Sequence, residues 1–144
     1  MKKAGIAILG LGVVGGGVYK ILTEKREYFK KTQGLDVTVE AVMEKNLERA
    51  LSLGIKKENV ASSIEEVVTN PNVDVVVEVI GGIEPSKTFV LKALKSGKTV
   101  VTSNKELFAK HWPELESAAK KMKNTFRAKE LPSTLFDNLV LKYV

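Results

Sequence analysis

Apolar and polar residues alternate along the chain with two different periods. Short runs rich in valine and isoleucine predict strands at residues 6–9, 37–43, 73–80 and 99–102. Between the first two runs, helical spacing relates Val14, Val18, Ile21 and Leu22. The third run is almost continuously apolar, which predicts a strand covered on both faces. This alternation of strands and helices predicts an α/β fold built on a doubly wound parallel sheet.

Capping residues indicate where the other helices begin. Asn46 is expected to cap a short helix, and Ser62 with Glu65 forms a capping-box pattern ahead of the next one. A further helix is expected over residues 85–95. The polar, lysine-rich stretch at 24–34 is expected only to lead into the second strand.

Length and composition favour one domain with a core of its own. The chain has 144 residues, of which 44% are hydrophobic. With no cysteine and one histidine, we expect neither a disulfide nor a metal site. We expect the domain at residues 1–124 and a divergent tail at 125–144. The tail predicts an amphipathic C-terminal helix, buried on the sheet or in a homodimer through Leu135, Phe136, Leu139, Val140 and Tyr143.

The charge and the apolar start of the chain raise two further possibilities that the residue types disfavour. The net charge is +6, but 20 of the 23 basic residues are lysines and aromatic residues make up 6%. Arginine and aromatic contacts to bases are therefore scarce, and we expect no nucleic-acid partner. Glycines interrupt the apolar stretch up to Val14, which favours a strand and turn over a signal peptide. With no window long enough to span a membrane, we expect a cytoplasmic protein.

A glycine motif follows the first predicted strand and opens the first predicted helix. It reads Gly10-Leu11-Gly12-Val13-Val14-Gly15, and we call these residues the phosphate loop. In a Rossmann domain, the first glycine permits the tight turn, the second lets the backbone approach a pyrophosphate, and the third allows helix and strand to pack closely. The sequence therefore predicts a dinucleotide cofactor here. A turn whose glycines serve packing alone is the alternative.

Two charged residues follow the second predicted strand, where such domains distinguish NAD from NADP. An acidic side chain there bonds the ribose hydroxyls, whereas a basic one accommodates the additional phosphate of NADP. Glu44 and Lys45 occupy these positions side by side. Lys45 favours NADP, with NAD as the other candidate, and both residues could instead be ordinary surface charges.

Two later segments, together with GLGVVGGGV at the start, carry a family resemblance. They read VVVEVIGGIEP from residue 75 and VVTSNKEL from residue 100. Over residues 4–120 the chain resembles the homoserine dehydrogenases. The resemblance implies an NAD(P)-binding domain of an oxidoreductase. The full enzymes interconvert homoserine and aspartate semialdehyde by hydride transfer, in the biosynthesis of threonine and methionine.

The resemblance also implies roles for residues after the third and fourth strands. It places Gly81 and Gly82 against the cofactor, Thr102 and Ser103 at the nicotinamide ribose, and Lys105 beside cofactor and substrate as a candidate catalytic residue. Lys105 is expected in the first turn of a helix capped by Asn104, where the helix dipole disfavours a cation unless an anion is near. Turn glycines, strand-end residues and a solvated lysine are the alternative interpretations.

Three departures from the family pattern limit what the chain is expected to do. Val13 replaces a common threonine, and Lys45 replaces a common arginine that would grip phosphate with two donors. After Ala119 the family continues into a further strand and a catalytic domain that carries substrate-handling aspartate and lysine residues. We therefore expect cofactor binding without turnover by this chain alone. A noncatalytic nucleotide-binding or interaction module derived from the family is the alternative.

Overall fold

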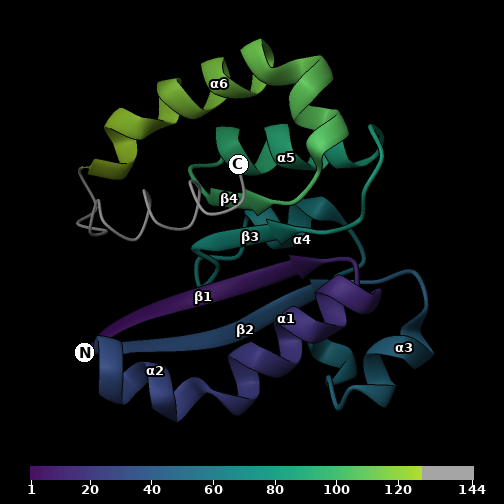
Figure 1. The fold of residues 1–144 in the computed structure, drawn as a ribbon, viewed down its shortest axis with the longest axis vertical. Helices are drawn as coiled ribbons and strands as arrows, with labels where there is room; N and C mark the ends of the chain where they lie inside the picture. The colour runs from purple at the N-terminus through teal and green to yellow at the C-terminus, as the bar shows by residue number, and fades with distance from the viewer. Residues whose placement is uncertain (128–144) are drawn as a thin grey trace.

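A computed structural model describes the backbone of residues 1–127 and the side chains of residues 1–121. Its sheet has four parallel strands in the order β2-β1-β3-β4 (Figure 1). The chain therefore moves outward from β1 to β2 on one side, and then crosses over to β3 and β4 on the other. This order confirms the predicted doubly wound α/β fold of the Rossmann type.

Strands and helices alternate as the apolar pattern predicted. The strands are β1 (Lys2–Leu9), β2 (Leu35–Met43), β3 (Val75–Glu78) and β4 (Thr99–Thr102). The helices are α1 (Val13–Glu24), α2 (Arg26–Gln33), α3 (Leu47–Ser52), α4 (Ile64–Val68), α5 (Ser86–Lys95) and α6 (Lys105–Arg127), with a 3-10 turn, η1, at Lys57–Asn59.

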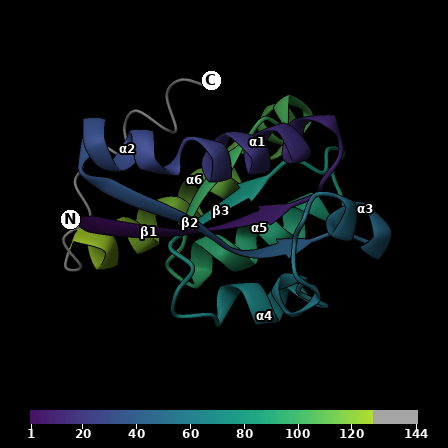
Figure 2. The ribbon, with the colours of Figure 1, turned by 90° about the horizontal axis from the view of Figure 1, so that it is seen from below.

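Each face of the sheet has its own hydrophobic cluster. Ile6 and Ile8 of β1 pack with residues of α1 and α2, whereas Ala7 and Leu9 pack with residues of α4 and α5. Figure 2 shows α1 and α2 on one side of the strands and α4 on the other. A third cluster, which includes Val90 and Leu107, joins α5 to α6. Successive side chains of β1 thus pack in turn against the helices on the two faces of the sheet.

Three local features differ from the sequence prediction. The stretch at 24–34, for which no element was predicted, contains helix α2, which ends at Gly34 with φ of 64°. The cap of α4 is Ser63 and not Ser62, because the Ser63 hydroxyl accepts from the Glu66 N–H at 3.3 Å. Helix α6 is interrupted at His111, two residues before Pro113, whose missing N–H breaks the helical ladder.

The remaining predictions about the tail lie outside the described residues. Helix α6 continues through the expected domain boundary at residue 124. The predicted final helix, with its apolar face from Leu135 to Tyr143, falls beyond residue 127.

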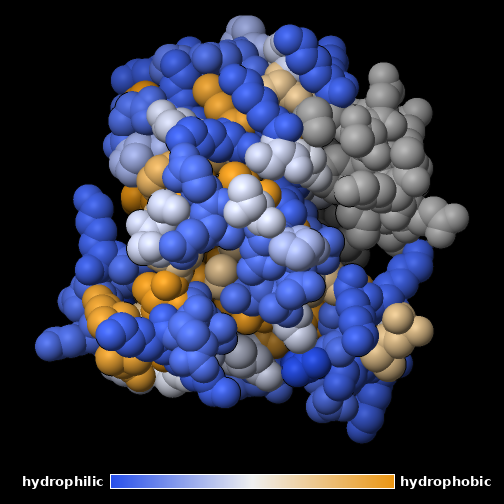
Figure 3. Space-filling model, turned by 180° about the vertical axis from the view of Figure 1, so that it is seen from behind, coloured by the Kyte–Doolittle hydropathy of each residue, from blue (hydrophilic) through white to orange (hydrophobic). Residues whose placement is uncertain are grey.

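No helix among residues 1–127 has the length and apolar character needed to cross a membrane. The surface seen from behind is mainly hydrophilic, with small hydrophobic areas (Figure 3).

Candidate functional site

The phosphate loop lies where the order of the strands reverses. It leaves the carboxyl end of β1, which lies between β2 and β3. The Gly10 N–H donates to the Met43 carbonyl at the end of β2 at 2.8 Å, and the Val79 N–H donates to the Leu9 carbonyl at 3.0 Å. These bonds join the loop to the ends of both neighbouring strands. Ligands of open parallel sheets bind in this crevice.

The three motif glycines occupy three different environments. Gly10 has φ of 96°, a conformation that side chains disfavour. A Cβ on Gly15 would lie 1.9 Å from the Gly10 carbonyl oxygen, so helix α1 can approach β1 only with glycine there. A Cβ on Gly12 would meet no described protein atom within 4 Å. Packing therefore explains Gly15 but leaves Gly12 without a structural requirement.

The start of helix α1 exposes polar backbone. Gly12 is its N-cap, and in the described chain no side chain caps this end and no acidic residue stands in the first turn. The first N–H groups of a helix have no partner within it and carry a partial positive charge. Val13 and Val14, beside these groups, are exposed. The arrangement can accept an anionic group, and phosphate is the usual one.

The two charged residues after β2 have different surroundings. The Glu44 carboxylate accepts from the Leu11 N–H at 2.7 Å and from the Asn46 N–H at 3.2 Å. It therefore ties the phosphate loop to the start of α3. Lys45 is exposed at the surface next to it, and no side-chain partner is found for it within the described part of the chain.

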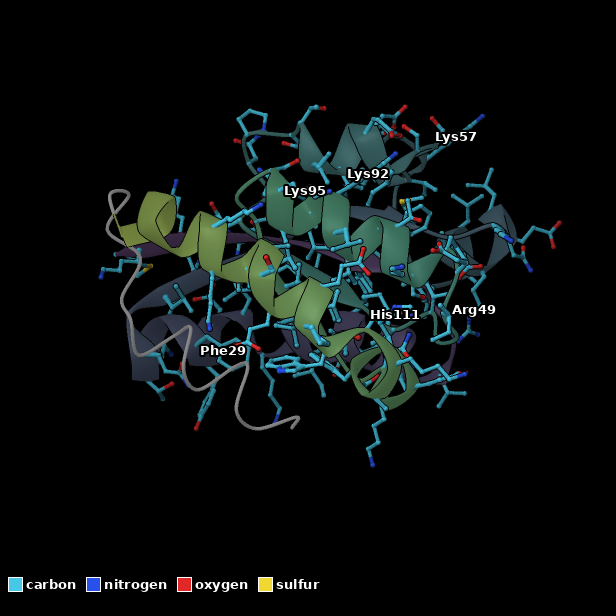
Figure 4. The ribbon with its side chains drawn as sticks, turned by 90° about the horizontal axis from the view of Figure 1, so that it is seen from above. Phe29, Arg49, Lys57, Lys92, Lys95 and His111 are labelled. Carbon is cyan, nitrogen blue, oxygen red and sulfur yellow. The ribbon has the colours of Figure 1, made fainter. Side chains whose placement is uncertain are left out.

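Arg49 contacts the phosphate loop, although no sequence motif points to this residue. Its Nε donates to the Leu11 carbonyl at 2.6 Å and its Nη2 to the Gly12 carbonyl at 3.4 Å. Arg49 belongs to α3 and is labelled in Figure 4. These bonds link residues 37 and 38 positions apart in the chain. A local sequence pattern contains no signal for such a contact.

A buried carboxylate organises the other side of the crevice. Glu78, the last residue of β3, has no exposed surface. One oxygen accepts from the N–H groups of Ile80 and Gly81 at 2.8 and 3.1 Å, and from the Ser86 hydroxyl at 3.1 Å. The other accepts from the Thr102 hydroxyl at 2.5 Å. Glu78 thereby fixes the relative positions of the ends of β3 and β4.

The remaining candidates surround this network. Gly81 and Gly82 have φ of 86° and 75° and form an exposed turn after β3. The Asn104 side chain donates to the Gly82 carbonyl at 2.5 Å and accepts from the Leu107 N–H at 3.1 Å, which confirms it as the cap of α6. Ser103 and Lys105 are exposed on either side of Asn104. Strand order thus brings both glycine turns and the start of α6 to one edge of the sheet.

Comparison with known proteins identifies the family to which the chain is similar. A family profile described as the NAD-binding domain of homoserine dehydrogenase matches residues 10–129. The homoserine dehydrogenase of Bacillus subtilis is 41% identical over 120 residues, which are 83% of this chain and 28% of that protein. The crystal structure of S. aureus homoserine dehydrogenase aligns with a TM-score of 0.74 and 37% identity, over 85% of this chain and 31% of that one.

A related structure contains a cofactor. A hyperthermophilic archaeal homoserine dehydrogenase mutant in complex with NADPH aligns with a TM-score of 0.64 and 28% identity, over 83% of this chain and 41% of that one. The matched part of the chain spans 28% of the length of the curated Bacillus subtilis relative. By the profile match and by these relatives, the chain belongs to the homoserine dehydrogenase family, of which it is the NAD-binding domain.

Proposed function

We propose that the phosphate loop holds the pyrophosphate of a nicotinamide dinucleotide at the start of helix α1. The observation that carries this proposal is the contrast between Gly15, where a Cβ would overlap the Gly10 carbonyl, and Gly12, where a Cβ would meet only open space. The packing of helix against strand requires Gly15, whereas Gly12 leaves room for a ligand against backbone N–H groups.

Within this function, Lys45 favours NADP over NAD. Its ammonium is exposed at the end of β2, where the additional phosphate of NADP is expected, while Glu44 is bonded to the loop. Calorimetric titration with NADP and with NAD tests the assignment. Lys45→Ala should weaken NADP more than NAD. Glu44→Ala should weaken both cofactors, because Glu44 also holds the phosphate loop, and it should weaken NAD more than NADP. Equal losses of both cofactors in both variants would remove these side chains from ribose recognition.

For the whole protein we propose homoserine and aspartate semialdehyde interconversion, with Lys105 and Ser103 near the reacting end of the cofactor and Gly81, Gly82 and Thr102 beside it. This assignment rests on family membership, and it includes a cytoplasmic location and a place in amino-acid biosynthesis. Hydride transfer requires a positioned base and a substrate held close to the nicotinamide. The 144-residue chain should bind cofactor without oxidising homoserine, because it matches the NAD-binding domain and covers 28% of the Bacillus subtilis relative.

The assay is NADPH formation from homoserine and NADP at high protein concentration, with a full-length family enzyme as the positive control. Background rates are the expected result. Saturable turnover that disappears in Lys105→Ala would show that this chain, alone or as a pair of copies, completes an active site.

A further inference from the structure

We propose that Arg49 positions the phosphate loop for the pyrophosphate, an inference that rests on the proposed dinucleotide function. The residue lies in α3, outside the glycine motif and outside the residues that distinguish NAD from NADP. Its guanidinium faces two successive loop carbonyls, those of Leu11 and Gly12. Arg49 is therefore assigned a role through the backbone of the loop and not through contact with the ligand.

The geometry of the peptide unit explains how a carbonyl contact orients an N–H group. In a trans peptide the C=O and the following N–H point in opposite directions. The one cis peptide in residues 1–127 is Glu84–Pro85, so the loop peptides are trans. When Arg49 holds the Leu11 and Gly12 carbonyls, the N–H groups of Gly12 and Val13 must point away from α3. Those two donors are at the exposed start of α1.

Glu44 holds the same segment from the amide side. Its carboxylate accepts from the Leu11 N–H at 2.7 Å, while Arg49 donates to the Leu11 carbonyl at 2.6 Å. Leu11 itself is fully buried. Both polar groups of this residue are thus engaged by charged side chains, and charge-assisted bonds are stronger than neutral ones. The loop is fixed before a ligand arrives, which lowers the cost of binding.

Gly16 supports this arrangement from helix α1. A Cβ at this position would lie 3.2 Å from Nη2 of Arg49, tighter than an ordinary contact. Glycine therefore leaves room for the guanidinium between α1 and α3. This accounts for a glycine that the dinucleotide motif does not require.

Calorimetry on the whole chain with NADP, NAD and adenosine 2′-monophosphate tests the proposal. Arg49→Ala should weaken NADP and NAD by the same factor, about tenfold, the usual worth of a charge-assisted hydrogen bond. Adenosine 2′-monophosphate has the ribose phosphate but no pyrophosphate, so its affinity should stay unchanged. Arg26→Ala is the matched control, because it removes an arginine that pairs with Asp36 instead of the loop.

Arg49→Lys is the second variant, in case the alanine variant folds poorly. Lysine keeps the charge but lacks the planar fork that spans two carbonyls. We therefore expect a smaller loss of affinity, again equal for NADP and NAD. A loss confined to NADP and adenosine 2′-monophosphate would overturn the proposal and make Arg49 a direct ligand of the 2′-phosphate. Unchanged affinities in both variants would overturn it as well. If the unmodified chain binds neither dinucleotide, the proposed function fails first.

Discussion

The phosphate loop and the Gly81-Gly82 turn both follow a strand at the same edge of the sheet, but glycine meets different needs in them. In the phosphate loop, Gly15 is required by crowding, because a Cβ would lie 1.9 Å from a backbone oxygen. In the second turn, neither glycine is crowded, and both have positive φ. The first turn requires glycine for close packing at Gly15 as well as for the positive φ of Gly10, whereas the second requires it for backbone conformation alone.

The two turns also differ in where their backbone polar groups bond. In the second turn, the N–H groups of Ile80 and Gly81 donate to Glu78, and the carbonyls of Gly81 and Gly82 accept from the Ser86 and Asn104 side chains. The phosphate loop instead opens a helix whose first N–H groups lack a side-chain cap. Of the two turns, the phosphate loop is therefore the one prepared to bind an anion through its backbone.

Removing the carboxylate that holds the second turn should have the largest effect on stability. Glu78→Ala removes the acceptor of the part-buried Ile80 and Gly81 N–H groups and of the buried Thr102 hydroxyl, and it leaves the Ser86 hydroxyl only the Gly81 carbonyl. We expect a loss of about 3 kcal/mol or more in the free energy of unfolding, measured by urea denaturation. Glu58→Ala, at an exposed position, is the control. Equal stability of Glu78→Ala and the unmodified chain would mean that the turn does not depend on this network.

The next effect in size tests crowding in the phosphate loop. Gly15→Ala should cost about 2–3 kcal/mol, because the new methyl group must displace backbone atoms of Gly10. Gly17→Ala, two residues later in the same helix, is the matched control. A Cβ there would meet no described protein atom within 4 Å. It should raise stability by about 0.5–1 kcal/mol through helix propensity. A neutral Gly15→Ala would remove the packing explanation.

The same contrast explains how far the sequence could predict the site. The glycine motif and the strand ends are local patterns, so the position of the phosphate loop followed from them. Glu78 is a charged residue in an otherwise apolar strand, but its partners Ser86 and Thr102 come from other parts of the chain. Arg49 reaches the loop across a gap of 38 residues. Contacts made by the tertiary fold have no periodic signal in the chain.

Helix α2 shows the same limit away from the site. Its sequence is polar, and none of its residues is buried, so apolar periodicity gave no reason to predict a helix. The half-buried Phe29 packs against the core cluster beside β1 and β2. Arg26, at the first position, donates to Asp36 at 2.6 and 3.0 Å, and Gly34 ends the helix in a left-handed conformation. One aromatic anchor, an ion pair and a cap thus replace an apolar face.

The smallest effect concerns the opposite edge of the sheet, which contains neither turn. Hydrogen bonds from Arg26 lower the pKa of Asp36 below its usual value. Because the folded pKa lies below the unfolded one, this stabilisation is complete above the ordinary aspartate pKa of about 3.9 and is lost as pH falls through the folded value. Arg26→Ala should therefore reduce stability at neutral pH and not in acid.

Urea denaturation of Arg26→Ala and of the unmodified chain, from neutral pH to acid, measures the difference in their free energies of unfolding. Cofactor affinity at neutral pH should be unchanged, because the ion pair lies away from the phosphate loop. A stability difference that persists at low pH would assign the effect of Arg26 to packing and not to the ionised aspartate.

The most direct test of the account is calorimetric titration of Gly12→Val with NADPH beside the unmodified chain. Gly12 has φ of −65° and ψ of −158°, which valine can adopt, and its Cβ would enter open space. The variant should therefore fold, with a loss of about 1 kcal/mol because valine is a poorer N-cap than glycine. Its side chain would occupy the space assigned to the pyrophosphate, so NADPH binding should be abolished. A folded Gly12→Val that binds NADPH with the affinity of the unmodified chain would contradict the assignment of the phosphate loop as the dinucleotide site.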